Sequence, residues 1–304
     1  MASLNVLVRR HGLSIATHAI LFVGSLVMAY PFVYGLLAGM STLVEFSRSI
    51  FLPIPGRLSL DNLNAVFAGA DFGVMFRNST IISAWYAFFP SLLALTSGYA
   101  FARLNFPGKN VAFLLLLASL MVPGQVSIVP IYIMVARWPL LGGNNILGQG
   151  GSGMIDTWWA LLSLGLVNAY AIFFVRQAIR TVPYEYDEAA RMDGAGVLRI
   201  IFQIYLPMLK PVMATVAVLS TIIGTSAINK WNDYFTPLIF TNGGPLNTIA
   251  LGATNFAGAV LANGQPNYPL LFMGASISMI PTILVFLIFQ RYLVQGFAMT
   301  GVKG

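Results

Sequence analysis

The residues best suited to chemistry in this 304-residue chain gather in one segment, 176–210. It holds four of the nine carboxylates and five of the sixteen basic residues, although only 8% of the chain is charged. Within it, Glu188 offers a carboxylate beside two small neighbours, Ala189 and Ala190, which let another backbone approach. This combination suits the docking of a helix into a groove of a partner protein, so Glu188 is the strongest single functional candidate.

The same segment carries the start and stop signals of two helices. Asp187 and Arg191 are spaced i,i+4 and can support the first helix, and the Asp-Gly pair at 193–194 is a turn signal. A second helix is predicted over 197–205, ending before Pro207. We therefore expect a helix–turn–helix that lies parallel to a membrane surface.

No catalytic site is predicted. The chain has no cysteine and only two histidines, which excludes Cys-based zinc sites and iron–sulfur clusters and disfavours a His-based metal site. It contains no G-x-x-x-x-G-K-[ST] sequence, so it lacks the usual phosphate loop for ATP. With 58% hydrophobic residues and far fewer charges than the roughly 25% of a soluble domain, the composition indicates a polytopic membrane protein.

Charge-free runs predict an all-α membrane protein with six transmembrane helices. Each is about the length needed to cross the bilayer core. The runs are 14–40, 78–102, 110–136, 157–175, 211–229 and 268–290. With the N-terminus inside, eleven of the sixteen Lys and Arg residues lie inside, and the net charge is +7 inside and 0 outside. Both termini are therefore predicted to be cytoplasmic.

This topology divides the chain into a cytoplasmic N-terminus (1–13), a membrane domain (14–295) and a cytoplasmic tail (296–304). The outside loops are 41–77, 137–156 and 235–269, and the charged segment 176–210 is inside. The last outside loop carries turn clusters at 241–245 and 263–267. The mildly apolar stretch 249–262 between them is too short for a span and suits an interfacial or re-entrant helix.

Two longer motifs carry a family resemblance. Glu188-Ala189-Ala190-Arg191-Met192-Asp193-Gly194-Ala195, followed by Ile204-Tyr205-Leu206-Pro207, resembles the EAA loop of ABC importer permeases. Trp231-Asn232-Asp233-Tyr234 and the C-terminal stretch 290–296 look like the carbohydrate-importer branch. The chain is most similar to the second membrane subunit of maltose-type and glycerol-phosphate-type systems. The glycine-rich stretch 141–154 departs from that pattern, because it looks longer than the usual second outside loop.

The resemblance implies a binding-protein-dependent ABC importer permease fold in a prokaryotic plasma (inner) membrane. A homologous second permease subunit would complete the pathway, two ATPase subunits would bind the EAA loops, and an extracytoplasmic binding protein would deliver the substrate. The chain itself would be no enzyme and bind no cofactor or nucleic acid, since ATP and Mg would be bound by the ATPases. In the family, the Glu matching Glu188 pairs with a basic residue of the ATPase.

Three sets of site residues are predicted. The ATPase-coupling set is Glu188, Ala189, Ala190, Asp193, Gly194, Ile204, Leu206 and Pro207. The set that faces the binding protein is Thr241, Asn242, Gly243, Asn263, Gly264, Gln265 and Asn267. Sugars need hydrogen-bonding groups in an otherwise apolar pathway, and the candidates for it are Asn168, Ser220, Thr221, Thr225 and Asn229. Ser and Thr in spans also commonly bond to helix carbonyls, so each has a structural alternative.

The predicted function is translocation of a sugar or oligosaccharide. Glycerol phosphodiesters and polyols are alternative substrates, because related systems carry them. A secondary transporter is the main rival class, yet the six predicted spans contain no charged residue of the kind that ion-coupled carriers often use. A non-transporting membrane scaffold is the second rival, and it leaves the charged inside segment unexplained.

Overall fold

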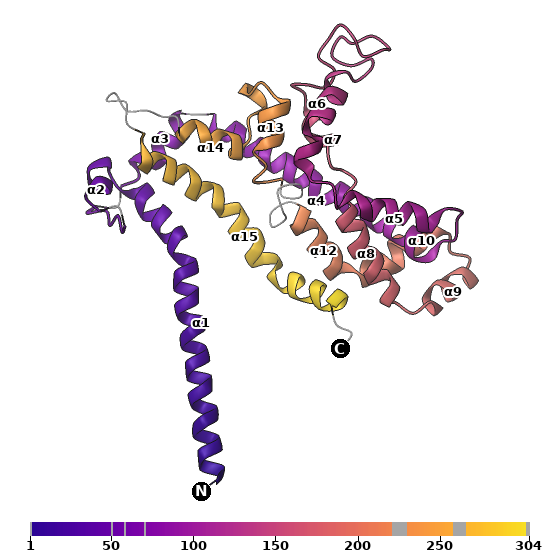
Figure 1. The fold of residues 1–304 in the computed structure, drawn as a ribbon, viewed down its shortest axis with the longest axis horizontal. Helices are drawn as coiled ribbons and strands as arrows, with labels where there is room; N and C mark the ends of the chain where they lie inside the picture. The colour runs from indigo at the N-terminus through magenta and orange to yellow at the C-terminus, as the bar shows by residue number, and fades with distance from the viewer. Residues whose placement is uncertain are drawn as a thin grey trace. The chain divides into compact units, whose positions relative to one another are not determined.

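The computed structural model describes residues 2–49, 51–57, 59–69, 71–220, 230–257 and 266–301, which form helices joined by loops (Figure 1). The chain divides into two compact units, 1–70 with 253–279 and 71–252 with 280–304. The α-helices are α1 (Ala2–Met40), α2 (Leu43–Arg48), α3 (Asp61–Gly69), α4 (Phe72–Arg103), α5 (Lys109–Ser119), α6 (Ile128–Ala136), α7 (Trp158–Ser163), α8 (Ala169–Thr181), α9 (Glu185–Met192), α10 (Val197–Ile200), α11 (Leu206–Met208), α12 (Lys210–Val218), α13 (Phe235–Phe240), α14 (Ile249–Ala257) and α15 (Tyr268–Gly301). Shorter helical turns are η1 (Gly124–Ser127), η2 (Ile201–Tyr205) and η4 (Gly244–Leu246).

Three of the described helices are long and apolar enough to cross a membrane. They are α1 over Ser14–Met40, α4 over Phe72–Arg103 and α15 over Tyr268–Gln295. A fourth span results if Val197–Met208 and Lys210–Val218, which meet at an angle of 83°, count as one. The prediction of an all-helical membrane protein is therefore confirmed, while the count of six spans stays a prediction.

Two of the predicted spans are interrupted. The run 110–136 is divided into α5 and α6 by Leu120–Ser127, which contains Pro123. The run 157–175 is divided into α7 and α8 near Gly165, whose φ of +87° lies in the left-handed region that ends a helix. A third predicted span, 211–229, is described only as far as Ser220. Charge-free runs reveal a segment's polarity but not the breaks in its backbone.

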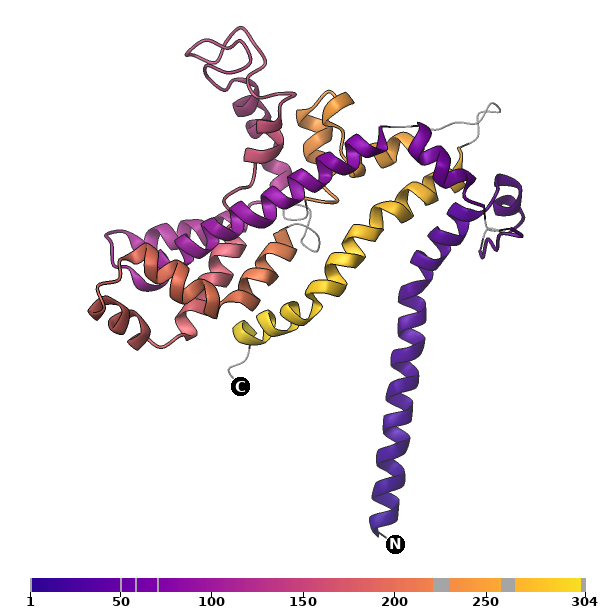
Figure 2. The same cartoon turned by 180° about the vertical axis from the view of Figure 1, so that it is seen from behind.

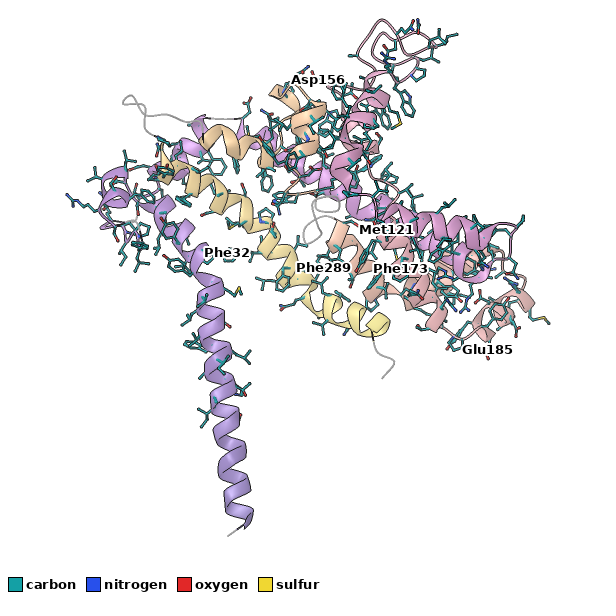
Figure 3. All side chains as sticks on the ribbon, in the orientation of Figure 1. Phe32, Met121, Asp156, Phe173, Glu185 and Phe289 are labelled. Atoms are coloured by element: carbon teal, nitrogen blue, oxygen red, sulfur yellow. The ribbon has the colours of Figure 1, made fainter. Side chains whose placement is uncertain are left out.

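In the unit of 1–70 with 253–279, α1 approaches the start of α15 very closely. A Cβ added at Gly39 would lie 2.8 Å from the backbone of Met273, so only glycine allows this packing. The amide of Asn62, at the start of α3, donates to the carbonyls of Gly39 and Ser41 at 2.8 and 2.9 Å. Most of α1 is exposed, including Phe32 (Figure 3), as suits a helix that faces lipid.

In the unit of 71–252 with 280–304, α4 packs along α8. A Cβ at Gly98 would lie 3.0 Å from Val175 Cγ1 and 3.1 Å from the Arg176 backbone nitrogen, so the two helices approach closely there. A continuous apolar core joins α4, α8, the inner face of α9 and the segment from α10 to α12. The views from both sides show α9 far from the loop after α6 (Figures 1 and 2).

Candidate functional site

The charged segment folds as predicted around its first helix, α9. Three carboxylates, Glu185, Asp187 and Glu188, occupy its first turn, where they suit the positive end of the helix dipole, and Arg191 occupies its last turn. Glu185 lies on the exposed side of α9 (Figure 3). α9 is therefore a short, amphipathic helix with its acidic end first.

The predicted turn after α9 is confirmed and forms a Schellman motif. The Gly194 N–H donates to the Arg191 carbonyl at 3.0 Å, and the Ala195 N–H donates to the Ala190 carbonyl at 2.9 Å. Gly194 has a φ of +75° but open space around its Cα, so the need for glycine there is conformational rather than steric.

The predicted coupling residues divide between two faces of α9 and the turn after it. Glu188, Ala189, Asp193 and Gly194 are exposed. Ala190 is buried in the chain's own core, so its small size serves packing inside this protein rather than contact with a partner. The exposed face also carries Met192, which is 88% exposed. An acidic and partly apolar surface is thus available to a partner.

Beneath that surface lies a buried polar network. The Asp187 side chain is fully buried, and its Oδ2 lies 3.1 Å from Nε of Arg103 on α4. Tyr99 donates to Asp187 Oδ1 at 2.7 Å, and Tyr205 donates to Asp187 Oδ2. The phenol of Tyr99 also raises the pKa of Arg191 through a hydrogen bond, which favours its charged form. Burying a charge without partners is very unfavourable, so this set of contacts explains how Asp187 stays inside.

Sequence reasoning missed this network. The spacing of Asp187 and Arg191 suggested a pair within α9, but the ion pair in the structure joins Asp187 to Arg103. A local signal existed in Asp187 and Ala190, which share the inner face at i,i+3. It could have indicated that Asp187 points inward, but not which distant residue neutralises it.

The second half of the charged segment differs from the prediction. The helix expected to end before Pro207 continues through η2, one turn of π-helix, to Met208 in α11. Pro207 lies in the first turn of α11, directly after the π-turn. Of the remaining predicted coupling residues, Ile204 and Leu206 are half-buried against the core, and Pro207 is exposed.

The turn that is predicted to face the binding protein is hydrogen-bonded to Asp156, at the end of the segment 137–156. Asp156 lies beside α13 (Figure 3), and its backbone N–H donates to the Phe240 carbonyl at 2.9 Å. Its carboxylate accepts from the Asn242 backbone at 3.1 Å and from the Asn242 amide at 3.3 Å. Thr241 is buried and donates to the Pro237 carbonyl at 2.7 Å, and the exposed residues of this turn are Asn242, Gly244 and Pro245.

The other predicted members of that set are divided. Gly243 has a φ of +81° and continues the turn after Asn242. Asn267 is half-buried and accepts from the Leu270 N–H at 3.3 Å, so it serves as a cap for α15. The remaining residues, Asn263, Gly264 and Gln265, lie outside the described residues.

The glycine-rich stretch after α6 has a defined shape. Nδ2 of Asn144 donates to the carbonyls of Ala136 and Trp138 at 2.9 and 3.0 Å, and its Oδ1 accepts from the Gly151 N–H at 2.8 Å. At Gly153 an added Cβ would lie 2.3 Å from the Val135 carbonyl oxygen. Glycine is therefore required there by both space and a φ of +61°.

The substrate-pathway candidates receive little support as ligands from the structure. Asn168 accepts from the Ala171 N–H at 3.0 Å and caps α8, which is a structural role. Ser220 is buried. Thr221, Thr225 and Asn229 lie outside the described residues. Among the residues that are described, no group of three His, Asp or Glu side chains could hold a metal ion.

Comparison with known proteins gives a consistent result. Residues 91–299 match the family model of the binding-protein-dependent transport system inner membrane component. The chain is 29% identical over 281 residues to the arabinooligosaccharides transport system permease protein AraQ of Halalkalibacterium halodurans, covering 91% of this chain and 92% of that protein. It is 30% identical over 290 residues to the sn-glycerol-3-phosphate transport system permease protein UgpE of Brucella suis biovar 1, covering 93% and 95%.

Among solved structures, the chain resembles one from the crystal structure of a bacterial ABC transporter involved in the import of the acidic polysaccharide alginate. The TM-score is 0.73 at 19% sequence identity, and the match covers 93% of this chain and 96% of that chain. The two chains therefore share a fold.

Proposed function

We propose that this chain, which belongs to the family of binding-protein-dependent transport system inner membrane components, is a permease subunit of an ATP-driven importer of a sugar or oligosaccharide. It supplies half of the translocation pathway in a prokaryotic plasma (inner) membrane, and a homologous second permease supplies the other half. Two partner ATPase subunits bind ATP and Mg and perform the hydrolysis.

The observation that carries this proposal is the exposed acidic face of α9. Glu188 and Ala189 stand on a helix whose opposite face is fixed by a buried ion pair, so the surface is both accessible and rigid. A rigid surface of this kind can receive a mechanical signal from a partner without bending. We assign Glu188, Ala189, Asp193 and Gly194 to the ATPase joint.

The proposed topology has six spans and cytoplasmic termini. The charge bias between the two sides supports it, as do three long apolar helices. In this proposal the interrupted helices α5–α6 and α7–α8 supply two more crossings, and the predicted span 211–229, which begins within α12, supplies the sixth. Broken helices are tolerated at membrane depth where they lie inside protein or line a pathway.

The outside surface receives the substrate-loaded binding protein. The turn at Asn242 and Gly243 is held by Asp156, so it projects as a fixed element rather than a loose loop. This surface lies in the same unit as α9 but far from it (Figures 1 and 2). Separate docking surfaces are what an importer needs to receive substrate on one side and energy on the other.

A carbohydrate is favoured as substrate by the relatives, one of which is a permease for arabinooligosaccharides. The glycerol-phosphate relative keeps sn-glycerol 3-phosphate as a second candidate. A phosphate ester carries charge and calls for cations in its path. Lys230 is the cation closest in sequence to the pathway candidates, and its ammonium donates to Asp233 at 2.7 Å. This pairing favours a neutral sugar.

Reconstitution tests the proposal. The chain should be placed in vesicles with and without its second permease, ATPase and binding protein, and uptake of labelled arabinooligosaccharide and sn-glycerol 3-phosphate measured. Uptake is expected only in the complete system with ATP inside. Uptake by the single chain would contradict the proposal, and preferential uptake of the phosphate ester would replace the substrate assignment.

The ATPase joint is tested by Glu188→Ala, with Glu185→Ala as a matched control one helical turn earlier. Truncating one partner of a buried charge pair at an interface costs roughly 2–5 kcal/mol, or about 30-fold or more in affinity. Glu188→Ala should therefore weaken co-purification of the ATPase or uncouple hydrolysis from uptake, and Glu185→Ala should do much less. If the two variants behave alike, the anchor role of Glu188 is wrong.

A further inference from the structure

The buried network around Asp187 joins segments that are remote in sequence. Tyr99 and Arg103 come from the last turns of α4, Asp187 from the first turn of α9, and Tyr205 from the end of η2. The side chain of Arg103 is only 9% exposed and that of Asp187 is fully buried. Only 8% of the residues in this chain are charged, and two of them form this contact.

The network is fully connected. Both oxygens of Asp187 accept hydrogen bonds from phenols, and Nε of Arg103 lies 3.1 Å from the carboxylate and 2.8 Å from the Tyr205 hydroxyl. The other end of the guanidinium donates to the carbonyls of Ile179, at 3.1 Å, and Val182. Arg103 therefore also ties α4 to the end of α8, immediately before α9 begins.

Stability alone does not account for such a network. A buried ion pair can often be replaced by well-packed apolar side chains with no loss of stability, because its desolvation offsets its attraction. Hydrogen bonds, however, restrain distance and direction, whereas an apolar contact lets two helices slide. The network therefore supplies a fixed register between α9 and α4 that the surrounding aliphatic core would not.

We propose that Asp187, Arg103, Tyr99 and Tyr205 form a latch that makes α9 and the end of α4 move as one body, so that displacement of α9 by the ATPase is passed to a membrane-spanning helix. Asp187 is a positioning residue in this scheme, and its neighbour Glu188 is the point of contact. The inference rests on the proposed function, because it assigns the route by which the signal leaves α9.

The test replaces the charges with apolar groups, in the double variant Asp187→Leu/Arg103→Met. This variant leaves no unpaired buried charge, but it lacks the directional contacts. In the reconstituted complex, uptake per ATP hydrolysed should fall about five-fold or more, the range of an ordinary coupling free energy. Ile200→Val, a change in the same apolar core that touches no polar contact, should retain the wild-type ratio.

A second readout reports the latch directly. The chain has no native cysteine, so spin labels can be placed at Glu185→Cys on α9 and at Phe88→Cys on an exposed part of α4. The wild-type distance distribution should stay narrow and unchanged when ATP is bound, and the double variant should broaden it. A wild-type coupling ratio together with an unbroadened distribution in the double variant would overturn the proposal.

The latch can still be tested if the double variant fails to assemble or if the wild-type complex fails to transport. If the double variant does not assemble, Tyr205→Phe keeps the ring in the core and removes only the hydroxyl with its two hydrogen bonds, to Arg103 and Asp187, and it should still lower the uptake ratio and broaden the distances. No effect of Tyr205→Phe on either would then overturn the latch. If the wild-type complex takes up none of the tested solutes, the proposed function fails, while the distance measurement still decides whether α9 and α4 form one body.

Discussion

The charged segment 176–210 and the glycine loop 137–156 both keep a defined shape outside the long helices, and they do so in opposite ways. The charged segment depends on side chains that carry charge, with Asp187 bound by Tyr99, 88 residues earlier in the chain. The glycine loop is uncharged between its end residues and depends on backbone groups. The side chain of Asn144 forms its three hydrogen bonds with residues no more than eight positions away.

This difference separates two kinds of rigidity. A segment whose shape depends on distant residues changes when those residues move, so it is suited to carrying a signal. A loop that satisfies its own backbone groups keeps its shape whatever the rest of the protein does, so it is suited to presenting a surface. The glycine loop accordingly presents apolar side chains to its surroundings, including that of Ile146, which is 74% exposed.

The largest effect is expected for Asp187→Ala. It leaves the Arg103 guanidinium buried without its carboxylate, which costs about 3–5 kcal/mol of folding free energy. Thermal denaturation of the purified protein in detergent should show a large fall in Tm for the whole chain. Glu188→Ala, at the next residue on the exposed face, should change stability by about 0.5 kcal/mol or less. Equal shifts would mean that Asp187 is no more structural than its neighbour.

A smaller and local effect is expected for Asn144→Ala. The change removes three hydrogen bonds and leaves the part-buried backbone groups that they satisfy without these partners, at about 1–3 kcal/mol. Because the side-chain partners of Asn144 all lie within eight residues of it, the loss should appear as faster proteolysis and hydrogen exchange within 137–156, with the Tm of the whole chain little changed. Ile146→Ser, on the exposed surface of the same loop, is the control. A Tm fall matching that of Asp187→Ala would show that the loop is not autonomous.

The smallest effect is expected for Gly194→Ala. The left-handed conformation costs a residue with a Cβ about 1–2 kcal/mol, but nothing lies close enough to clash. Gly194→Asn should be tolerated better, because asparagine adopts this conformation more readily. Tm values of the two variants measure the difference. Loss of ATPase association with unchanged Tm would mean that the turn itself is part of the joint.

What the sequence could predict follows from the range of the interactions. The helix that contains Asp187 and Arg191, its turn at Gly194 and the helix after Thr248 depend on local signals, and the sequence predicts all three. The partner of Asp187 could not be found, because Arg103 lies 84 residues away and nothing in the local pattern selects it. The breaks near Pro123 and Gly165 were missed because hydropathy records polarity and not backbone geometry.

The π-helical turn Ile201–Tyr205 has a consequence for how the length of this segment can vary. A π-turn holds one residue more than an α-turn, and each residue of an α-helix advances the side chains by about 100°. Deleting one residue there would restore a regular helix, but it would rotate Tyr205 relative to α10 and carry its hydroxyl away from Asp187. Between α9 and the 83° bend after Met208, both the number of residues and the rotation of the helix are therefore fixed. This segment should tolerate the insertion or deletion of a single residue least.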